Sequence, residues 1–179
     1  MQIIAGSVKG KKLITPKGSG TRPALAQVRE AIFSSLGDVE GLVILDVFAG
    51  CGSLSLEGLS RGADFAYFID SDSKAVQTII TNLENLGFSD KGHIFKRRLP
   101  QGLKRLNLEK NPDIIFCDPP YDKALLNPTL QGLVDHKLID AKTTIIVEHT
   151  RREMPDIEDL ELMKQKKYGQ TLISFLQLK

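Results

Sequence analysis

The chain has 179 residues, a length that favours a single domain of ordinary size. Hydrophobic residues make up 41% and charged residues 26%, values typical of a folded globular protein and unlike those of a disordered tail. No apolar run approaches the ~18–20 residues that span a bilayer, and no long apolar stretch follows a basic one at the start. We therefore expect neither a membrane span nor a signal peptide.

The two cysteines of the chain are Cys51 and Cys117. Two thiols do not form a disulfide framework, and they cannot by themselves make a zinc site. We therefore expect a reduced, cytoplasmic setting and no metal. The three histidines lie far apart without the spacing of metal ligands, and we interpret them as surface or structural residues: His93, His136 and His149.

A net charge of +2 conceals an asymmetry along the chain. Residues 1–30 contain six basic side chains and one acidic side chain, whereas the remaining residues have a net charge of −3. The six are Lys9, Lys11, Lys12, Lys17, Arg22 and Arg29. A basic N-terminal arm on a slightly acidic body indicates a polyanionic partner reached from one end, although charge alone fits a solvated terminus equally well.

The first 37 residues are predicted to form a small extension. Residues 2–15 are typical of two short strands around Lys9-Gly10-Lys11, which would be a hairpin with a basic turn. Pro23 is a favoured first residue of a helix, and Gly37 would end that helix. The apolar face of the helix would consist of Leu25, Val28, Ile32 and Leu36. We assign residues 1–37 to this extension and residues 38–179 to the main domain.

The main domain alternates short apolar runs with helical patterns. Continuous apolar runs at residues 42–45, 65–69, 114–117 and 145–147 are typical of strands that are covered on both faces of a parallel sheet. Helical spacing of apolar residues occupies residues 76–86, with Gly87 as a C-cap, and residues 126–134. Residues 160–163 and 172–176 flank Tyr168-Gly169 and predict an antiparallel pair that closes the sheet. The fold class is therefore α/β, doubly wound with right-handed crossovers.

A glycine-containing loop follows the first predicted strand. Residues 46–52 (Asp-Val-Phe-Ala-Gly-Cys-Gly) precede a helix, and Gly50 and Gly52 allow a tight turn and close approach of a ligand. Position 55 holds Ser55 where a diphosphate-binding fold needs a third glycine. The next strand ends at Asp70, whose carboxylate could accept hydrogen bonds from two ribose hydroxyls. Together these features favour an adenosine-containing ligand without a diphosphate, although a plain strand-to-helix turn is the alternative.

A second loop, Asp118-Pro119-Pro120-Tyr121, directly follows the strand at residues 114–117. The prolines lack N–H donors, so the loop presents acceptors: the Asp118 carboxylate and backbone carbonyls such as that of Pro119. Two acceptors suit a planar amine, and the Tyr121 ring suits stacking of a base, which contributes roughly 1–3 kcal/mol. The alternative is a rigid proline turn with an exposed tyrosine.

These loops resemble the class I S-adenosylmethionine-dependent methyltransferases that act on amino groups. Over essentially the whole chain, the sequence is similar to the RsmD family, the guanine-N2 methyltransferases of bacterial 16S rRNA. The motifs that carry the similarity are residues 3–13, 21–23, 28–33, 46–52, 118–121 and 167–169.

The resemblance implies a Rossmann-like, mostly parallel sheet of seven strands with the last strand inserted antiparallel. It implies S-adenosylmethionine as methyl donor and 16S rRNA or an assembling small subunit as partner, with no membrane and no obligate protein partner. It places the target guanine at Asp118, Pro119, Pro120 and Tyr121. It assigns the cofactor to Asp46, Phe48, Gly50, Gly52 and Asp70, and RNA binding to residues 1–37.

One position departs from the family pattern. Relatives carry an acid after the third strand to meet the adenine amino group, whereas this chain has Lys96-Arg97-Arg98-Leu99. Adenine would then be held by backbone groups or by a stacked guanidinium. Three alternative functions remain open at this point: an adenine-N6 or protein-glutamine methyltransferase with the same proline loop, a nicotinamide dehydrogenase, and a non-catalytic RNA-binding module.

Overall fold

The computed structural model describes residues 1–15, 23–120 and 123–179, and this part of the chain folds around one seven-stranded sheet. The strands are β1 (Val43–Val47), β2 (Phe65–Asp70), β3 (Gly92–Lys96), β4 (Ile114–Cys117), β5 (Thr144–His149), β6 (Leu160–Tyr168) and β7 (Thr171–Leu178). The helices are α1 (Pro23–Leu36), α2 (Ser53–Ser60), α3 (Ser73–Leu86), α4 (Leu126–Asp135) and the short 3-10 helix η1 (Gln101–Arg105). None of the described helices combines the length and apolar character needed to cross a membrane.

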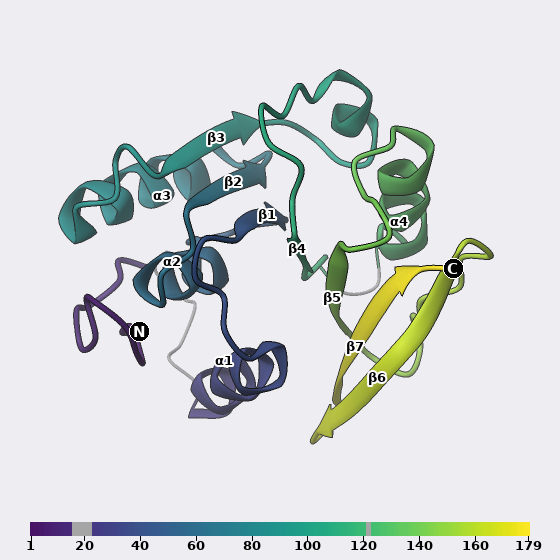
Figure 1. The fold of residues 1–179 in the computed structure, drawn as a ribbon, viewed down its shortest axis with the longest axis horizontal. Coiled ribbons are helices and arrows are strands. Elements are labelled where there is room, and N and C mark those ends of the chain that lie inside the picture. The colour runs from purple at the N-terminus through teal and green to yellow at the C-terminus, as the bar shows by residue number, and fades with distance from the viewer. Residues whose placement is uncertain (16–22, 121–122) are drawn as a thin grey trace.

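The spatial order of the strands is β3-β2-β1-β4-β5-β7-β6 (Figure 1). Strands β1 to β5 run parallel to one another, whereas β7 is antiparallel to both β5 and β6. The predicted α/β fold, the seven-stranded sheet and the reversed final strand are therefore confirmed. The order reverses direction beside β1, so the carboxyl ends of β1 and β4 border the crevice where open α/β sheets bind ligands.

Helices cover both faces of the sheet (Figure 1). One face packs against α1, α2 and α3 through a core that includes Phe33, Phe68 and Phe116. The opposite face packs against α4 and η1 through a core that includes Leu130 and Leu103. Burial on both faces explains why β1 and β4 are buried at every position and continuously apolar apart from Asp46, as parallel strands generally are.

The predicted ends of two helices are confirmed. Helix α1 begins at Pro23, and Gly37 follows it with a φ of 79° and donates its N–H to the carbonyl of Phe33. The side chain of Asp72 caps the start of α3 by accepting from the Lys74 N–H. Gly87, with a φ of 78°, ends α3 in the left-handed conformation that favours glycine.

The N-terminal segment differs from the predicted hairpin of two strands. Residues 2–12 form an antiparallel turn with a single bridge between Gln2 and Lys12, supported by the hydrogen bond from the Ile3 N–H to the Lys11 carbonyl. Apart from such short backbone pairing, the segment is held by α2, beside which it lies in Figure 1. The Ser60 hydroxyl donates to the Ala5 carbonyl and accepts from the Val8 N–H. Side-chain hydrogen bonds from α2 therefore take the place of most of the backbone hydrogen bonds expected between two strands of a hairpin. We call this set of side-chain contacts the anchor of the N-terminal segment.

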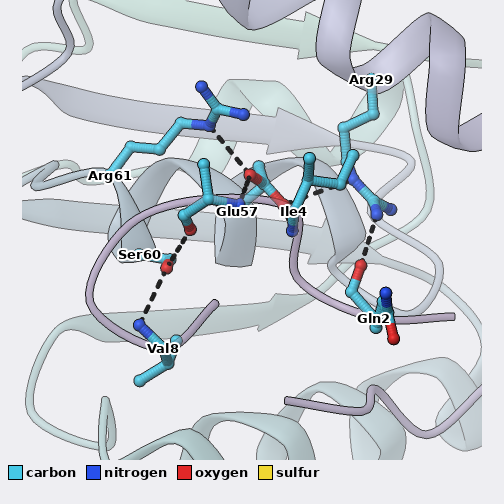
Figure 2. A network of polar contacts seen from close by, with 8 residues as sticks. Gln2, Ile4, Val8, Arg29, Glu57, Ser60 and Arg61 are labelled. Carbon is cyan, nitrogen blue, oxygen red and sulfur yellow. Dashed lines mark hydrogen bonds and ion pairs between the residues drawn. The ribbon is translucent and has the colours of Figure 1, made fainter. Parts of the chain in front are cut away.

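Glu57 of α2 is the centre of this anchor (Figure 2). Its side chain is fully buried, and its two carboxylate oxygens accept the N–H groups of Ile4 and Ala5 at 2.8 and 2.9 Å. Arg61 donates to Glu57 Oε1 at 2.8 Å, and Arg29 Nε lies 3.5 Å from Oε2. One buried carboxylate thus joins the N-terminal segment, α1 and α2.

The structure corrects the place of Arg29 in the basic arm. Arg29 is 4% exposed, and its guanidinium donates to the Gln2 carbonyl at 2.6 Å in addition to pairing with Glu57. Its charge is therefore neutralised inside the protein rather than offered to a partner. Lys9, Lys11 and Lys12 are exposed on the N-terminal turn, whereas Lys17 and Arg22 lie outside the described residues.

We expect Glu57→Gln to destabilise the fold by about 3–5 kcal/mol, because it leaves the Arg29 guanidinium buried without its anion. Urea unfolding followed by circular dichroism measures the loss. The matched control is Glu84→Gln on α3, which removes an exposed carboxylate and should change stability by less than about 0.5 kcal/mol. Equal effects of the two substitutions would show that Glu57 is not an anchor.

Candidate active site at the carboxyl edge of the sheet

The register of four parallel strands brings four functional side chains into one row. Val47 pairs with Ile69 on one side and with Cys117 on the other, and Cys117 pairs with Val147. The residues that follow these four partners are Phe48, Asp70, Asp118 and Glu148. Neighbouring strands lie about 4.8 Å apart, so the row is continuous along the sheet edge in the order Asp70, Phe48, Asp118, Glu148.

A cavity of about 640 Å³ opens at the Asp70 end of this row, and we call it the Asp70 cavity. Its lining includes Asp70, Ser71, Arg98, Leu99 and Pro120. The volume lies within the roughly 300–1,000 Å³ typical of small-molecule sites. Both carboxylate oxygens of Asp70 accept backbone hydrogen bonds, Oδ2 from Gly50 at 2.8 Å and Oδ1 from Asp72 at 2.9 Å. These bonds fix the carboxylate while leaving lone pairs on each oxygen for a ligand hydroxyl.

A smaller cavity of about 210 Å³ lies at the other end of the row, and we call it the Asp118 cavity. The carboxylates of Asp118 and Glu148 line it together with Gly50 and the α1 residues Val28 and Arg29. Its volume is below the range for a whole small-molecule ligand and suits one flat ring inserted between α1 and the sheet edge.

Phe48 lines both cavities and therefore stands between them. Its φ of 67° lies in the left-handed region, where a bulky residue is a genuine outlier. The cavities are connected in two further ways. Gly50 in the Asp118 cavity donates its N–H to Asp70 in the Asp70 cavity, and Asp118 and Pro120 belong to one loop. A group bound in one cavity is thus a close neighbour of a group bound in the other.

The glycines of the loop have separate roles. An ideal Cβ at Gly50 meets nothing within 4 Å, and the residue has a φ of 58°, so Gly50 exposes its backbone to the cavity. A Cβ at Gly52 would lie 3.1 Å from the Phe68 ring, and Gly52 starts α2 with a φ of 78°. Gly52 therefore permits close packing of the loop on β2. It is not among the lining residues of the Asp70 cavity or the Asp118 cavity.

Asp46 lies beneath the cavities rather than in their described linings. It is 3% exposed and accepts a hydrogen bond from the Ser55 hydroxyl at 2.9 Å. Burial raises the pKa of Asp46 to about 7, while the Ser55 hydrogen bonds oppose that shift. Contact between Asp46 and a ligand ammonium group stays a prediction.

The proline loop presents Asp118 at the mouth of the smaller cavity. Asp118 is exposed and lines this cavity. Desolvation by the surrounding protein raises the pKa of Asp118 well above its usual range, and the charges of Glu148 and Asp46 add to the shift. Pro119 is buried and Pro120 is exposed at the Asp70 cavity. Tyr121, the fourth residue of the motif, lies outside the described residues.

Sequence reasoning missed Glu148 and Arg29 as site residues. Glu148 stands near the end of a buried strand, as Asp70 does, so the argument that selected Asp70 could have selected it as well. Arg29 was counted with the arm, and no signal in the sequence distinguishes it from the exposed lysines. Cys51 also lines the Asp118 cavity, and burial raises the pKa of its thiol, which agrees with a spacer and not a nucleophile.

The doubly wound sheet with a reversed last strand, together with ligand-sized cavities at its carboxyl edge, is the architecture of the class I methyltransferases. Within that class, the chain belongs to the family described as "Conserved hypothetical protein 95", which matches residues 1–177. Relatives named Ribosomal RNA small subunit methyltransferase D confirm the expected RsmD family membership.

Two relatives and one solved structure illustrate the similarity. "Putative rRNA methyltransferase YlbH" of Bacillus subtilis strain 168 is 35% identical over 178 residues, which cover 96% of this chain and 95% of that protein. "Ribosomal RNA small subunit methyltransferase D" of Escherichia coli K12 is 35% identical over 149 residues, covering 83% and 74% of the two chains. The solved structure "Putative methyltransferase yhhF from Escherichia coli" has a TM-score of 0.85 at 29% identity and covers 100% of this chain and 98% of that one.

We expect Asp46 to titrate near pH 7 and Ser55→Ala to raise its pKa, because the lost hydroxyl stabilises the ionised carboxylate. Between the ordinary pKa of 3.8 and about 7, the folded protein holds a proton that the unfolded chain has released. The contribution of Asp46 to stability therefore falls as the pH rises through this window. Carboxyl ¹³C shifts of the wild type and Ser55→Ala measure both pKa values, and an Asp46 pKa near 4 in the wild type would contradict the expectation.

Proposed function

We propose that the protein transfers a methyl group from S-adenosylmethionine to the exocyclic N2 amine of a guanine in small-subunit ribosomal RNA. The observation that carries this proposal is the single row of Asp70, Phe48, Asp118 and Glu148, with one cavity on each side of Phe48. A donor in one cavity and an amine in the other would be adjacent. Family membership and the names of the relatives support the same reaction.

The residues of the Asp70 cavity fit the methyl donor. The fixed Asp70 carboxylate is placed to accept from ribose hydroxyls, and the open side of Gly50 leaves room for a ligand beside the backbone. Arg97 and Arg98 stand where relatives carry an acid, and their exposed guanidiniums offer flat faces for adenine to stack on, above the buried Leu99. When bound, S-adenosylmethionine supplies an electrophilic methyl carbon on a positively charged sulfur.

The Asp118 cavity is proposed to hold the target base. The Asp118 carboxylate and the Pro119 carbonyl accept the two N–H groups of the amine and direct its lone pair towards the methyl carbon. Burial and the charges of Glu148 and Asp46 raise the pKa of Asp118. The positively charged sulfur of a methyl donor in the adjoining cavity would favour the ionised form of Asp118. Methyl transfer would form the N–C bond as the C–S bond breaks, with the bonding electron pair staying on the departing neutral sulfur. The Asp118 carboxylate, whose pKa is raised, would accept the proton that the methylated amine releases. The rate enhancement would come from alignment of the amine nitrogen with the methyl carbon and from stabilisation of the positive charge that grows on the nitrogen. No covalent enzyme intermediate is formed.

The N-terminal extension, residues 1–37, is proposed to bind the RNA. Lys9, Lys11 and Lys12 are exposed on one turn, and the Glu57 anchor fixes that turn on α2. Met1, at the start of the same segment, lines the Asp118 cavity. Phosphates bound by the turn would therefore lie near the base-binding cavity. An unpaired RNA loop lowers the cost of extruding the base, which is a few kcal/mol from a stacked helix.

We expect Asp118→Ala to lower methyl transfer by about a hundredfold or more while S-adenosylmethionine still binds, because the substitution removes an oriented acceptor from the amine and leaves the Asp70 cavity intact. Incorporation of labelled methyl groups into small-subunit rRNA measures turnover, and calorimetry measures cofactor affinity. Mass spectrometry of digested rRNA identifies the modified nucleoside as N2-methylguanosine.

Asp135→Ala is the matched control for this experiment, since it removes an exposed carboxylate at the end of α4. Turnover of the control should equal that of the wild type. Near-normal turnover of Asp118→Ala would remove Asp118 from the mechanism. Methylated adenine in the RNA, or labelled glutamine in a protein acceptor, would replace the proposed substrate by one of the alternatives that share the proline loop.

Neutralising the turn with Lys9→Gln, Lys11→Gln and Lys12→Gln should flatten the salt dependence of rRNA binding. Each lost phosphate contact reduces the log–log slope by about 0.7–0.9, so three contacts reduce it by roughly 2–3. The control carries Lys104→Gln, Lys137→Gln and Lys142→Gln, which remove the same charge from exposed positions outside the extension. If both triple variants bind with the same slope, the RNA is bound elsewhere.

A further inference from the structure

Glu148 is a second carboxylate in the Asp118 cavity, and the transfer reaction described above gives it no role. It is half-buried on β5, and its neighbour Val147 pairs in register with Cys117, which precedes Asp118. The backbones of Asp118 and Glu148 therefore follow paired residues of adjacent parallel strands, and such strands lie about 4.8 Å apart. Residues at one level of a sheet share a face, so both side chains belong on the α1 side, which agrees with the cavity lining.

The rest of the cavity lining limits what can lie beside Glu148. The lining includes the apolar residues Val28, Ile32 and Leu54, and Arg29, which pairs with Glu57 and donates to the Gln2 carbonyl. Desolvation raises the pKa of Asp118, and the negative charge of Glu148 adds to that shift. A base in this cavity would therefore meet carboxylates from two adjacent strands, and each carboxylate can accept a hydrogen bond from the base.

Guanine alone among the four RNA bases presents three N–H donors side by side on its Watson–Crick edge, one on N1 and two on N2. Asp118 and the Pro119 carbonyl account for the two donors of the N2 amine. The N1 donor adjoins them on the same edge and needs one further acceptor. Adenine instead has a lone pair on N1, which a carboxylate repels. An enzyme that extrudes a base reads this edge by hydrogen bonds.

We infer that Glu148 selects guanine by accepting the N1–H of the extruded base beside the reacting amine. This inference rests on the proposed guanine-N2 reaction and assigns its base specificity to one side chain. Glu148 thereby provides the physical difference between this site and an adenine-N6 site built on the same proline loop. A site that hydrogen-bonds a polar group of its substrate rejects analogues that lack that group. A lone pair on N1 in place of the N–H would also be repelled by the Glu148 carboxylate.

The test replaces the target guanosine by 2-aminopurine riboside in ligated rRNA, after the wild-type enzyme has been used to map the target. 2-Aminopurine keeps the reacting 2-amino group but carries a lone pair on N1. We expect the wild type to prefer guanosine by at least about tenfold in kcat/KM. Glu148→Gln should lower that preference by at least about tenfold, because the amide N–H can donate to the N1 lone pair.

Glu161→Gln on the exposed strand β6 is the matched control and should leave the preference unchanged. Glu148→Ala is the second variant, and it should lose activity on guanosine without gaining activity on 2-aminopurine. Circular dichroism and S-adenosylmethionine affinity verify that each variant is folded with an intact Asp70 cavity. The ratio of the two substrates cancels general effects on folding or alignment.

Two results overturn the inference while leaving the proposed function in place. The wild type could methylate both RNAs equally, which overturns it without any variant. A folded Glu148→Gln enzyme could keep the wild-type preference, whether or not its activity on both RNAs falls. A wild type that modifies no guanine in small-subunit rRNA would instead overturn the proposed function itself.

Discussion

Parallel in-register pairing of β2, β1, β4 and β5 is the constraint on which the whole site depends. Because the pairs Val47–Ile69, Val47–Cys117 and Cys117–Val147 are aligned, the next residue of every strand lies at one level of one edge. Four chain segments that are distant in sequence thereby contribute neighbouring side chains. A shift of one residue in any of these strands would turn its functional side chain to the opposite face, so the buried cores on both faces also determine the position of the site.

The buried carboxylate of Glu57 extends that constraint to the N-terminal segment. The segment forms one antiparallel bridge and few regular backbone bonds, so a fixed position requires other contacts. Glu57 accepts two of its N–H groups and pairs with Arg29 and Arg61, which connects the segment to α1 and α2 at once (Figure 2). Arg29 and Met1 also line the Asp118 cavity. The same contacts that hold the basic turn therefore shape one wall of the Asp118 cavity.

The elements that were predictable from the sequence are those governed by local rules. Buried apolar runs indicated the strands, and Pro23 and Gly87 marked helix ends. The acid at the end of β2 and the proline loop after β4 were selected from the sequence, and both contribute residues to the cavity linings. The predicted N-terminal hairpin was wrong in detail because the Glu57 side chain, 52 and 53 residues further along the chain, accepts two of its N–H groups. Arg29 was misplaced for the same reason, since its partner Glu57 is distant in sequence. Glu148 was missed because its place beside Asp118 follows from the pairing of Cys117 with Val147 in the sheet and not from the spacing of residues along the chain.

Phe48 explains how two cavities can adjoin without merging. As the first residue beyond β1 it lies between Asp70 and Asp118 in the row along the sheet edge, and it lines both cavities. The left-handed φ of 67° costs of order 1–3 kcal/mol for a bulky residue, so its surroundings must hold it in place. The Ala49 N–H donates to the Ile69 carbonyl and the Gly50 N–H donates to Asp70, so the two residues after Phe48 are both tied to β2. The strained backbone at Phe48 is thus the local consequence of the sharp turn that returns the chain to β2 between the two cavities.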